Sequence, residues 1–571
     1  MTESLASVAA TALLAEFIAS GVTDLVLSPG SRSQALALAA AQFERAGLLR
    51  LRVRIDERSA GFLALGLAVE TRRPVLIVVT SGTAVAELHP AVLEASHSGV
   101  PLIVLSADRP SELLGVGANQ TTVQPGIFGS AVERSWDVAP PAGAFDEDPA
   151  ASARVLVAEV LTGIRGPRHV NLAYREPLSS PVRLPDVEPG DWPPAPAPFE
   201  VIELQPGPGT VVVAGTGAGA EAEAAARALG APLLAEVASG ARFGPNLVAS
   251  YRELLRAANF RDRIERVIVF GHPTLSREVP ALIQSGRVET IVVRGSGPGR
   301  RRDDFNPGRR VSRFADAVTV ADGPAALEAS RTWVGRWVQT SRALLEEGEA
   351  ADPGSAPGAA LTDDYRERAA FARTQLEALR APVTRRALAL AVWNASWPHD
   401  RLVLASSRLI RELDQVAPGK KIPVHSNRGL AGIDGTIATA TGIALAQQAA
   451  GDSADSSRGI TRVLLGDLAM LHDAGSLLAG VGEERPRMQL IVGNDGGGTI
   501  FDGLEVSSIF PVGSPDAALL DRVMLTPQRV DLAALAAAYG WEYRLVTSRG
   551  ELDPALSPRD ERVLVEVPLT R

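Results

Sequence analysis

The stretches that decide the fold of this chain are Thr461-Arg462-Val463-Leu464-Leu465-Gly466-Asp467-Leu468 and Gln489-Leu490-Ile491-Val492-Gly493-Asn494-Asp495-Gly496. Each is a short apolar run that contains β-branched residues and stops on a turn with a small oxygen-bearing side chain. The separation between the two turns matches about one strand–helix–strand unit. Such units build parallel sheets flanked by helices, so an α/β fold is expected.

The two turns also suggest a metal site. Both are expected at the carboxyl edge of a parallel sheet, where ligands bind. The Asp467 carboxylate, the Asn494 amide oxygen and the backbone carbonyl of Gly496 suit a hard divalent cation that phosphate oxygens also hold. The alternative is two ordinary turns, since Asp, Asn and Gly are common there.

The composition is that of a globular protein with 571 residues, too many for one core, which predicts about three domains. A net charge of −9 argues against nucleic acid or an anionic membrane as the main partner. Because the chain contains no cysteine, disulfides, thiolate nucleophiles and cysteine-ligated metals are excluded. No apolar run could span a bilayer and no signal-peptide pattern occurs, so a cytoplasmic location is expected.

Two breaks divide the chain into sections in which strand-like runs alternate with helical patterns. The first break, 181–198, is rich in proline, and the second, 346–362, is rich in Gly, Ala, Pro and acidic residues. Three domains are therefore expected over residues 1–181, 200–345 and 363–571, each a mostly parallel sheet flanked by helices.

Polar turns follow several strand-like runs of the first section. Near Ser31 and Arg32, amides at a helix start and a guanidinium could bind an anion, although a helix cap with a surface arginine is the better explanation when this stretch is taken alone. At Ser81 and Gly82 a backbone could approach a ligand closely. Glu57 precedes a very apolar helix expected from Ala60, where its carboxyl suits a heterocyclic nitrogen; the alternative is an acid favoured by the helix dipole.

Further polar groups could bind carboxylates. Arg109, Asn119 and Gln120 offer a carboxylate clamp and two amides, or alternatively a solvated loop. In the last section, Ser407 ends a strand-like run and Arg411 lies one turn into the next helix.

A glycine-rich loop runs from His425 to Gly435 and contains Arg428. Ile433 is unusual there, because a bulky residue in a ligand-binding loop should have a steric task. The helix expected over 436–448 is rich in small residues and could pack closely against another subunit.

Taken together, these stretches resemble the thiamine diphosphate-dependent decarboxylases and carboligases over essentially the whole chain. The motifs that carry the resemblance are Ser28-Pro29-Gly30-Ser31-Arg32-Ser33, Asp108-Arg109-Pro110, Gly117-Ala118-Asn119-Gln120 and Ser426-Asn427-Arg428-Gly429. The resemblance implies a thiamine diphosphate-binding fold with pyrimidine-binding (1–181), central (200–345) and pyrophosphate-binding (363–571) domains. It also implies a homodimer or a dimer of dimers with active sites at the subunit interface.

The resemblance further implies how thiamine diphosphate is bound. Glu57 would bond the pyrimidine nitrogen, and Ile433 would force the cofactor into a bent shape. Mg²⁺, or Mn²⁺, would be held on the diphosphate by Asp467, Asn494 and Gly496. The other cofactor-binding residues implied are Ser31, Ser81, Gly82, Gly466 and Leu468.

The branch it resembles most, a group of transferases, decarboxylates 2-oxoglutarate and adds the carbanion to isochorismate in menaquinone biosynthesis. An acidic protein that binds two dicarboxylates needs arginines in its pocket. The residues implied for catalysis and substrate binding are Glu57, Arg32, Arg109, Asn119, Gln120, Ser407, Arg411 and Arg428. One alternative is another 2-oxoacid carboligase such as an acetohydroxyacid synthase. Another is a nucleotide-binding regulatory protein that uses the Gly215–Gly219 turn.

The chain departs from the family pattern at a few positions. Leu468 and Gly493 stand where the wider superfamily has glycine and asparagine, Arg277 replaces a substrate-side lysine, and Ser406 replaces an asparagine. Thr499 lengthens the loop before Ile500 and Phe501.

Overall fold

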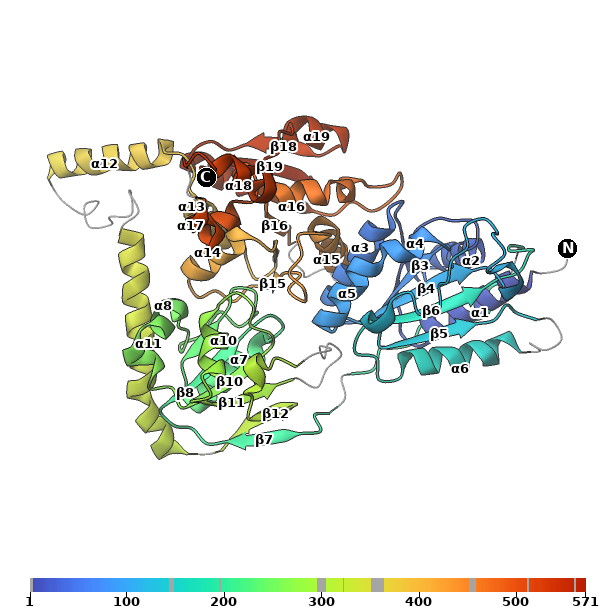
Figure 1. The fold of residues 1–571 in the computed structure, drawn as a ribbon, viewed down its shortest axis with the longest axis horizontal. Coiled ribbons are helices and arrows are strands. Elements are labelled where there is room, and N and C mark those ends of the chain that lie inside the picture. The colour runs from blue at the N-terminus through green and yellow to red at the C-terminus, as the bar shows by residue number, and fades with distance from the viewer. Residues whose placement is uncertain are drawn as a thin grey trace.

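A computed structural model describes residues 4–142, 148–181, 183–194, 197–294, 304–321, 323–350, 364–450, 459–510, 513–558 and 561–571. Within these residues the strands form two six-stranded sheets, one five-stranded sheet and one two-stranded sheet, and the pairs within them are parallel. Helices flank the three large sheets (Figure 1). The expected α/β fold class is confirmed.

The N-terminal sheet has the order β2-β1-β3-β4-β6-β5. Its strands are β1 (Asp24–Leu27), β2 (Arg50–Val53), β3 (Val75–Val79), β4 (Leu102–Asp108), β5 (Arg134–Val138) and β6 (Arg168–Ala173). Its helices are α1 (Leu5–Ala19), α2 (Gln34–Arg45), α3 (Glu57–Thr71), α4 (Thr83–Glu87), α5 (His89–Ser98) and α6 (Pro149–Leu161). The strands β1, β3 and β4 are buried along their whole length, as expected for parallel strands covered on both faces.

The middle sheet has the order β12-β11-β10-β8-β9, and a separate pair joins β7 (Val201–Leu204) to β13 (Ala317–Val320). Its strands are β8 (Thr210–Ala214), β9 (Leu233–Ala235), β10 (Arg266–Phe270), β11 (Glu289–Val293) and β12 (Arg313–Ala315). Its helices are α7 (Gly219–Leu229), α8 (Tyr251–Arg256), α9 (Ala258–Arg261), α10 (Glu278–Gln284) and α11 (Pro324–Ala350).

The C-terminal sheet has the order β15-β14-β16-β17-β19-β18. Its strands are β14 (Arg401–Leu404), β15 (Val424–His425), β16 (Thr461–Gly466), β17 (Met488–Asn494), β18 (Glu542–Leu545) and β19 (Val563–Pro568). Its helices are α12 (Tyr365–Arg380), α13 (Arg385–Ala395), α14 (Arg408–Val416), α15 (Thr436–Ala450), α16 (Asp467–His472), α17 (Val506–Ile509), α18 (Ala517–Leu520), α19 (Leu532–Ala538) and α20 (Leu552–Leu556). Taken in chain order, its strands are arranged as in the N-terminal sheet, although the two sections share no visible sequence repeat.

The helices α3 and α15 occupy equivalent places in these two sheets, since each follows the second strand of its sheet. They pack against each other between the sheets (Figure 1). The close partner of α15 in this structure is therefore α3 of the same chain, whereas the sequence suggested another subunit. In addition, α3 begins at Glu57, before the expected start at Ala60, so Glu57 belongs to the helix itself.

The two breaks differ from simple linkers. In the proline-rich break, the Gly190 amide donates to the Ile18 carbonyl at 3.1 Å, so that the segment packs against the end of α1. The helix α11 continues to Ala350, past the break expected at 346, and residues 351–362 lie outside the described residues. None of the helices in the described part of the chain has the length and apolar character needed to cross a membrane.

Candidate active site

All the residues that the sequence assigned to a site lie after the carboxyl ends of strands in the two six-stranded sheets. In the N-terminal sheet they follow β1 (Ser31, Arg32), β2 (Glu57), β3 (Ser81, Gly82) and β4 (Arg109, Asn119, Gln120). In the C-terminal sheet they follow or end β14 (Ser407, Arg411), β15 (Arg428, Ile433), β16 (Gly466, Asp467, Leu468) and β17 (Asn494, Gly496). The two sets therefore occupy equivalent edges of two sheets with the same strand order.

The turns that carry Asp467 and Asn494 are adjacent. Strands β16 and β17 pair in parallel with Gly466 opposite Gly493, so the next residue of each strand lies at the same level. The Asp467 side chain is buried, with 5% of the residue exposed. Burial raises the pKa of Asp467 to about 6, and the charge of Asp495 adds to the effect. No arginine, lysine or histidine among the described residues forms an ion pair with Asp467.

The amide of Asn494 is oriented by a neighbouring strand. Its Nδ2 donates to Glu566 Oε1 of β19 at 2.7 Å, which leaves the amide oxygen on the side of the following turn. That oxygen accepts a long hydrogen bond of 3.3 Å from the Gly496 amide. Gly496 and Gly497 have φ angles of 77° and 135°, and a Cβ on Gly497 would lie 2.3 Å from the Leu525 carbonyl. The turn after Asn494 therefore requires glycine.

These oxygen atoms have the chemistry of a magnesium site: a buried carboxylate, an amide oxygen and a turn of backbone carbonyls. Asp495 does not contribute, because its carboxylate accepts from Arg385 Nη2 at 2.8 Å and from the Thr499 hydroxyl. The described residues contain no group of three or more His, Asp or Glu side chains able to hold a metal. A cation here would thus depend on a single carboxylate together with amide, backbone and phosphate oxygens.

Glu57 is the first residue of α3 and is half-buried. Its carboxylate makes no hydrogen bond or ion pair with a described residue. The next residue, Arg58, donates to the His472 carbonyl at 3.1 Å and lies 3.7 Å from Asp473. Because His472 ends the helix that Asp467 begins, the start of α3 lies beside the far end of α16.

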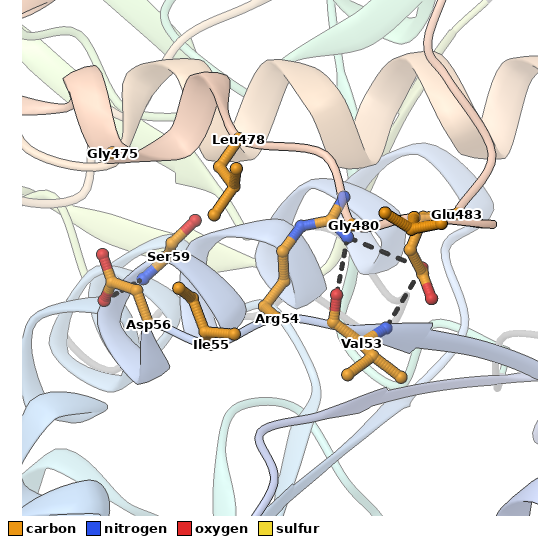
Figure 2. Close-up of a pocket in the computed structure, with 10 residues that line it drawn as sticks. Val53, Arg54, Ile55, Asp56, Ser59, Gly475, Leu478, Gly480 and Glu483 are labelled. Atoms are coloured by element: carbon orange, nitrogen blue, oxygen red, sulfur yellow. Dashed lines mark hydrogen bonds and ion pairs between the residues drawn. The ribbon is translucent and has the colours of Figure 1, made fainter. Parts of the chain in front are cut away.

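A pocket of about 290 Å³ opens next to Glu57, between the end of β2 and the segment 475–483 (Figure 2). Its polar groups satisfy one another, since Glu483 accepts from the Val53 amide at 3.1 Å and pairs with Arg54 at 3.6 Å. Its apolar residues are exposed instead: 72% of Ile55 is accessible, and Leu478 and Val481 are exposed as well. Glu57 does not line the pocket.

Ser81, Arg109 and Gln120 are joined by hydrogen bonds. The Arg109 guanidinium donates to the Ser81 hydroxyl and, at 2.7 Å, to the Gln120 carbonyl. The Gln120 amide donates to the Ser81 carbonyl at 2.9 Å. Burial lowers the pKa of Arg109, and the nearby charge of Arg32 lowers it further. Asn119 is exposed and makes no hydrogen bond with a described residue.

The turn at Gly82 is held by Gln124, a buried residue that was not expected at the site from the sequence. Gln124 accepts from the Gly82 amide at 2.9 Å and donates to Asn171 at 2.8 Å. Asn171 in turn donates to Asp108, at the end of β4, at 3.0 Å. No motif marks Gln124, which lies in a loop without regular structure.

In the C-terminal sheet, Arg411 donates to the Ser407 carbonyl at 2.6 Å. Burial lowers the pKa of Arg411, as do the charges of Arg252 and Arg277 from the middle sheet. The charges of two arginines from the middle section therefore reach Arg411. Of these two residues, only Arg277 was expected near the substrate from the sequence, because no motif surrounds Arg252 of α8.

Ile433 is partly buried against the apolar core of the C-terminal sheet. The loop that carries it ends at Gly435, whose φ is 63° and where a Cβ would lie 2.0 Å from the Phe62 ring of α3. The glycine at 435 therefore lets the loop touch α3, the helix that Glu57 begins.

The sequence matches known proteins over nearly its whole length. Residues 8–128 match the family described as "Thiamine pyrophosphate enzyme, N-terminal TPP binding domain". Proteins named 2-succinyl-5-enolpyruvyl-6-hydroxy-3-cyclohexene-1-carboxylate synthase are similar from end to end. The one from Leifsonia xyli is 55% identical over 98% of this chain and 96% of its own length. Those from Clavibacter michiganensis and Kineococcus radiotolerans are 54% and 41% identical, over 96% and 94% of their lengths.

Proposed function

This chain belongs to the family of 2-succinyl-5-enolpyruvyl-6-hydroxy-3-cyclohexene-1-carboxylate synthases, and from that premise we propose that it is the thiamine diphosphate-dependent transferase of menaquinone biosynthesis that this name describes. It decarboxylates 2-oxoglutarate and adds the remaining four-carbon unit to isochorismate, with release of CO₂. The observation that carries this function is the identity of 55% along the whole chain. The alternatives of a pyruvate-using carboligase and a nucleotide-binding regulator have no comparable support.

The cofactor fits the oxygen atoms at the ends of β16 and β17. Asp467, Asn494 and Gly496 would hold Mg²⁺ or Mn²⁺ on the diphosphate, and Gly466 and Leu468 flank them. A buried carboxylate with no protein cation beside it supports this ligand set, because a buried charge needs a partner. When bound, thiamine diphosphate supplies a nucleophilic carbon and an electron sink for the decarboxylation.

Two residues would prepare the cofactor. Glu57 would hold a proton against the pyrimidine nitrogen, and its position at the start of α3 without a protein partner leaves the carboxylate available. Ile433 would fix the bent shape by steric contact, which its loop supports because it is held between the C-terminal core and α3. Ser31, Ser81 and Gly82 would contact the cofactor from the N-terminal sheet.

The arginines would bind the substrate carboxylates. Arg32 and Arg109 lie in each other's field, and Arg411 lies in the field of Arg252 and of Arg277. Because like charges placed together repel, a bound dianion relieves the repulsion and gains two-pronged hydrogen bonds. Ser407, Asn119, Gln120 and Arg428 would complete the substrate site.

We also propose an assembly of at least two chains with active sites between them. The pocket beside Glu57 supports it, since the exposed Ile55, Leu478 and Val481 form an apolar surface that a second copy could cover. The three large sheets support division into the pyrimidine-binding, central and pyrophosphate-binding domains expected over residues 1–181, 200–345 and 363–571.

The test is to incubate the purified chain with 2-oxoglutarate, isochorismate, thiamine diphosphate and Mg²⁺, and to measure CO₂ and the condensed product. Both are expected, in equal amounts. Omission of isochorismate should abolish the condensed product. Product formation from pyruvate but not from 2-oxoglutarate would instead support the acetohydroxyacid synthase alternative, and no product from either would contradict both.

A further inference from the structure

The side chain of Arg428 is held by the middle sheet, although the residue itself belongs to the C-terminal one. Its Nε donates to the Thr274 hydroxyl at 2.9 Å, and its Nη2 donates to the Thr274 carbonyl at 3.2 Å. Its Nη1 donates to the Ser406 hydroxyl at 3.1 Å. Only 3% of Arg428 is exposed. Thr274 follows β10 at the carboxyl edge of the middle sheet.

Thr274 is itself fixed by a buried carboxylate. Glu236, which follows β9, accepts from the Thr274 amide at 2.8 Å and from the Leu275 amide at 2.7 Å. The Glu236 amide donates to the Ala214 carbonyl at the end of β8, so the carboxylate is anchored to the sheet. The ends of three strands of the middle sheet, β8, β9 and β10, are thereby joined by hydrogen bonds next to Arg428.

Buried hydrogen bonds also connect the middle sheet to the C-terminal sheet. Asp414 of α14 accepts from the Val237 amide at 2.8 Å and from the Tyr251 hydroxyl at 2.8 Å. The Arg242 guanidinium donates to the Ala417 carbonyl at 2.8 Å. These groups are buried and hydrogen-bonded, so the contact between the two sheets has a defined geometry.

The backbone that follows Arg428 is held by helix α5, which belongs to the N-terminal sheet. Glu94 of α5 is buried and accepts from the Gly429 amide at 2.7 Å and from the Leu430 amide at 2.8 Å. The N-terminal sheet therefore fixes the main chain after Arg428, while the middle sheet fixes its guanidinium.

A guanidinium has five N–H groups, and the bonds to Thr274 and Ser406 use three of them. One N–H remains on each of Nη1 and Nη2, and neither bonds a described residue. Each of these two groups can still donate to a carboxylate oxygen. Their direction is set by the bonds that hold the other edge of the group.

We propose that Thr274 and Glu236 are positioning residues of the substrate site, which aim the two remaining N–H groups of Arg428 at a substrate carboxylate. The inference rests on the function proposed above, in which Arg428 binds one of the two dicarboxylates. In this arrangement the middle sheet contributes to substrate recognition. Thr274 and Glu236 act only through Arg428 and touch no substrate.

The first test is Thr274→Val, which removes the hydroxyl but keeps the carbonyl and nearly the same volume. The KM for one dicarboxylate is expected to rise about tenfold, while the affinity for thiamine diphosphate with Mg²⁺, measured by calorimetry, changes less than about twofold. Thr274→Ser should restore the KM. The matched control is Thr290→Val, because Thr290 is a buried residue of the same sheet whose hydroxyl has no hydrogen-bond partner among the residues that the structure describes.

The second test asks whether Thr274 acts through Arg428. In an Arg428→Ala background, Thr274→Val should lower kcat/KM by less than about twofold, because the guanidinium it orients is gone. An equal loss in both backgrounds would show a general structural role and overturn the inference. Should Thr274→Val fold poorly, Glu236→Ala, which removes the acceptor of the Thr274 and Leu275 amides, carries the same test with the same expected rise in KM.

The outcomes distinguish failure of the proposed function from failure of the positioning role. If the wild-type chain forms no product, the proposed function fails. If the wild type is active and both Thr274→Val and Glu236→Ala keep the wild-type KM, the function stands and the positioning role of Thr274 and Glu236 is wrong.

Discussion

Gly66 of α3 and Gly442 of α15 face each other where the two helices cross. A Cβ on Gly442 would lie 2.2 Å from the Leu63 carbonyl oxygen, and a Cβ on Gly66 would lie 2.0 Å from the Thr439 carbonyl oxygen. The contacted atoms are backbone, so no side chain can move aside to make room. The approach of these helices fixes how the two six-stranded sheets, and hence the two halves of the proposed site, are placed in one chain.

Gly442→Ala should therefore destabilise the protein, by roughly 1–3 kcal/mol, because one methyl group overpacks a contact between backbones. Thermal unfolding followed by circular dichroism measures the change. Gly335→Ala is the control: Gly335 lies within α11 with no atom within 4 Å of an added Cβ, so alanine should be neutral or stabilising there. Equal melting temperatures for Gly442→Ala and the wild type would contradict the close crossing.

Glu566→Ala should weaken Mg²⁺ binding in the presence of thiamine diphosphate by about 10–100-fold, as is typical when a group that orients a metal ligand is lost. The reason is that Glu566 accepts from Asn494 Nδ2 and so keeps the Asn494 oxygen on the side of the turn. Titration calorimetry measures the affinity. Tyr543→Phe removes the other hydrogen bond to Glu566 without touching Asn494 and should have a smaller effect.

Glu57→Gln should lower turnover by about 10²-fold or more, because an amide cannot exchange a proton with the pyrimidine nitrogen at neutral pH. The fold should be unaffected, since the helix cap is Asp56, which accepts from the Ser59 amide at 3.2 Å. Product formation and the melting temperature are measured together. Turnover near that of the wild type would refute the role proposed for Glu57.

Glu70 should stabilise the protein in a pH-dependent way. Burial alone would raise the pKa of Glu70, but its pairing with His425 and Arg401 outweighs the burial and lowers the pKa to about 2. Arg401 Nη2 lies 2.7 Å from Glu70 Oε1, and His425 Nε2 lies 3.2 Å from Oε2. Because the folded-state pKa is below the unfolded value of about 4.5, the stabilisation is complete above pH 4.5 and is lost as the pH falls toward 2.

The variant Glu70→Gln tests this dependence by urea unfolding at several pH values. At pH 7 it should be roughly 2–4 kcal/mol less stable than the wild type. The difference should shrink as the pH is lowered from 4.5 toward 2, provided that both proteins remain folded at the start of the titration. A difference that stays constant over that range would show that the charge of Glu70 is not responsible.

Much of the fold could be predicted from local patterns. The apolar runs that end at Asp467 and Asn494 are the strands β16 and β17, and those near Leu25, Ile77 and Val104 are β1, β3 and β4. Buried parallel strands are continuous apolar runs, and polar turns must follow where they leave the sheet. The placement of the candidate residues at strand ends followed from this rule. Their roles in catalysis stay predictions.

Residues that act through distant partners could not be predicted. Gln124, Glu236 and Thr274 carry no motif, and each is a plain polar residue until the chain has folded. Glu236 and Thr274 matter because Arg428, far along the chain, donates to Thr274. The sequence also gave no sign that the two six-stranded sheets share one strand order, since different residues can satisfy the same pattern of burial.

By itself, then, the sequence determined the parallel α/β sheets, the strand ends with oxygen ligands and the family, because these depend on residues that are close together along the chain. Only the tertiary structure decided that α3 crosses α15 at Gly66 and Gly442, and that the middle sheet holds the guanidinium of Arg428. The physical reason is that such contacts arise when distant segments pack and bury their polar groups. Which donor then meets which acceptor depends on how the sheets are placed in space.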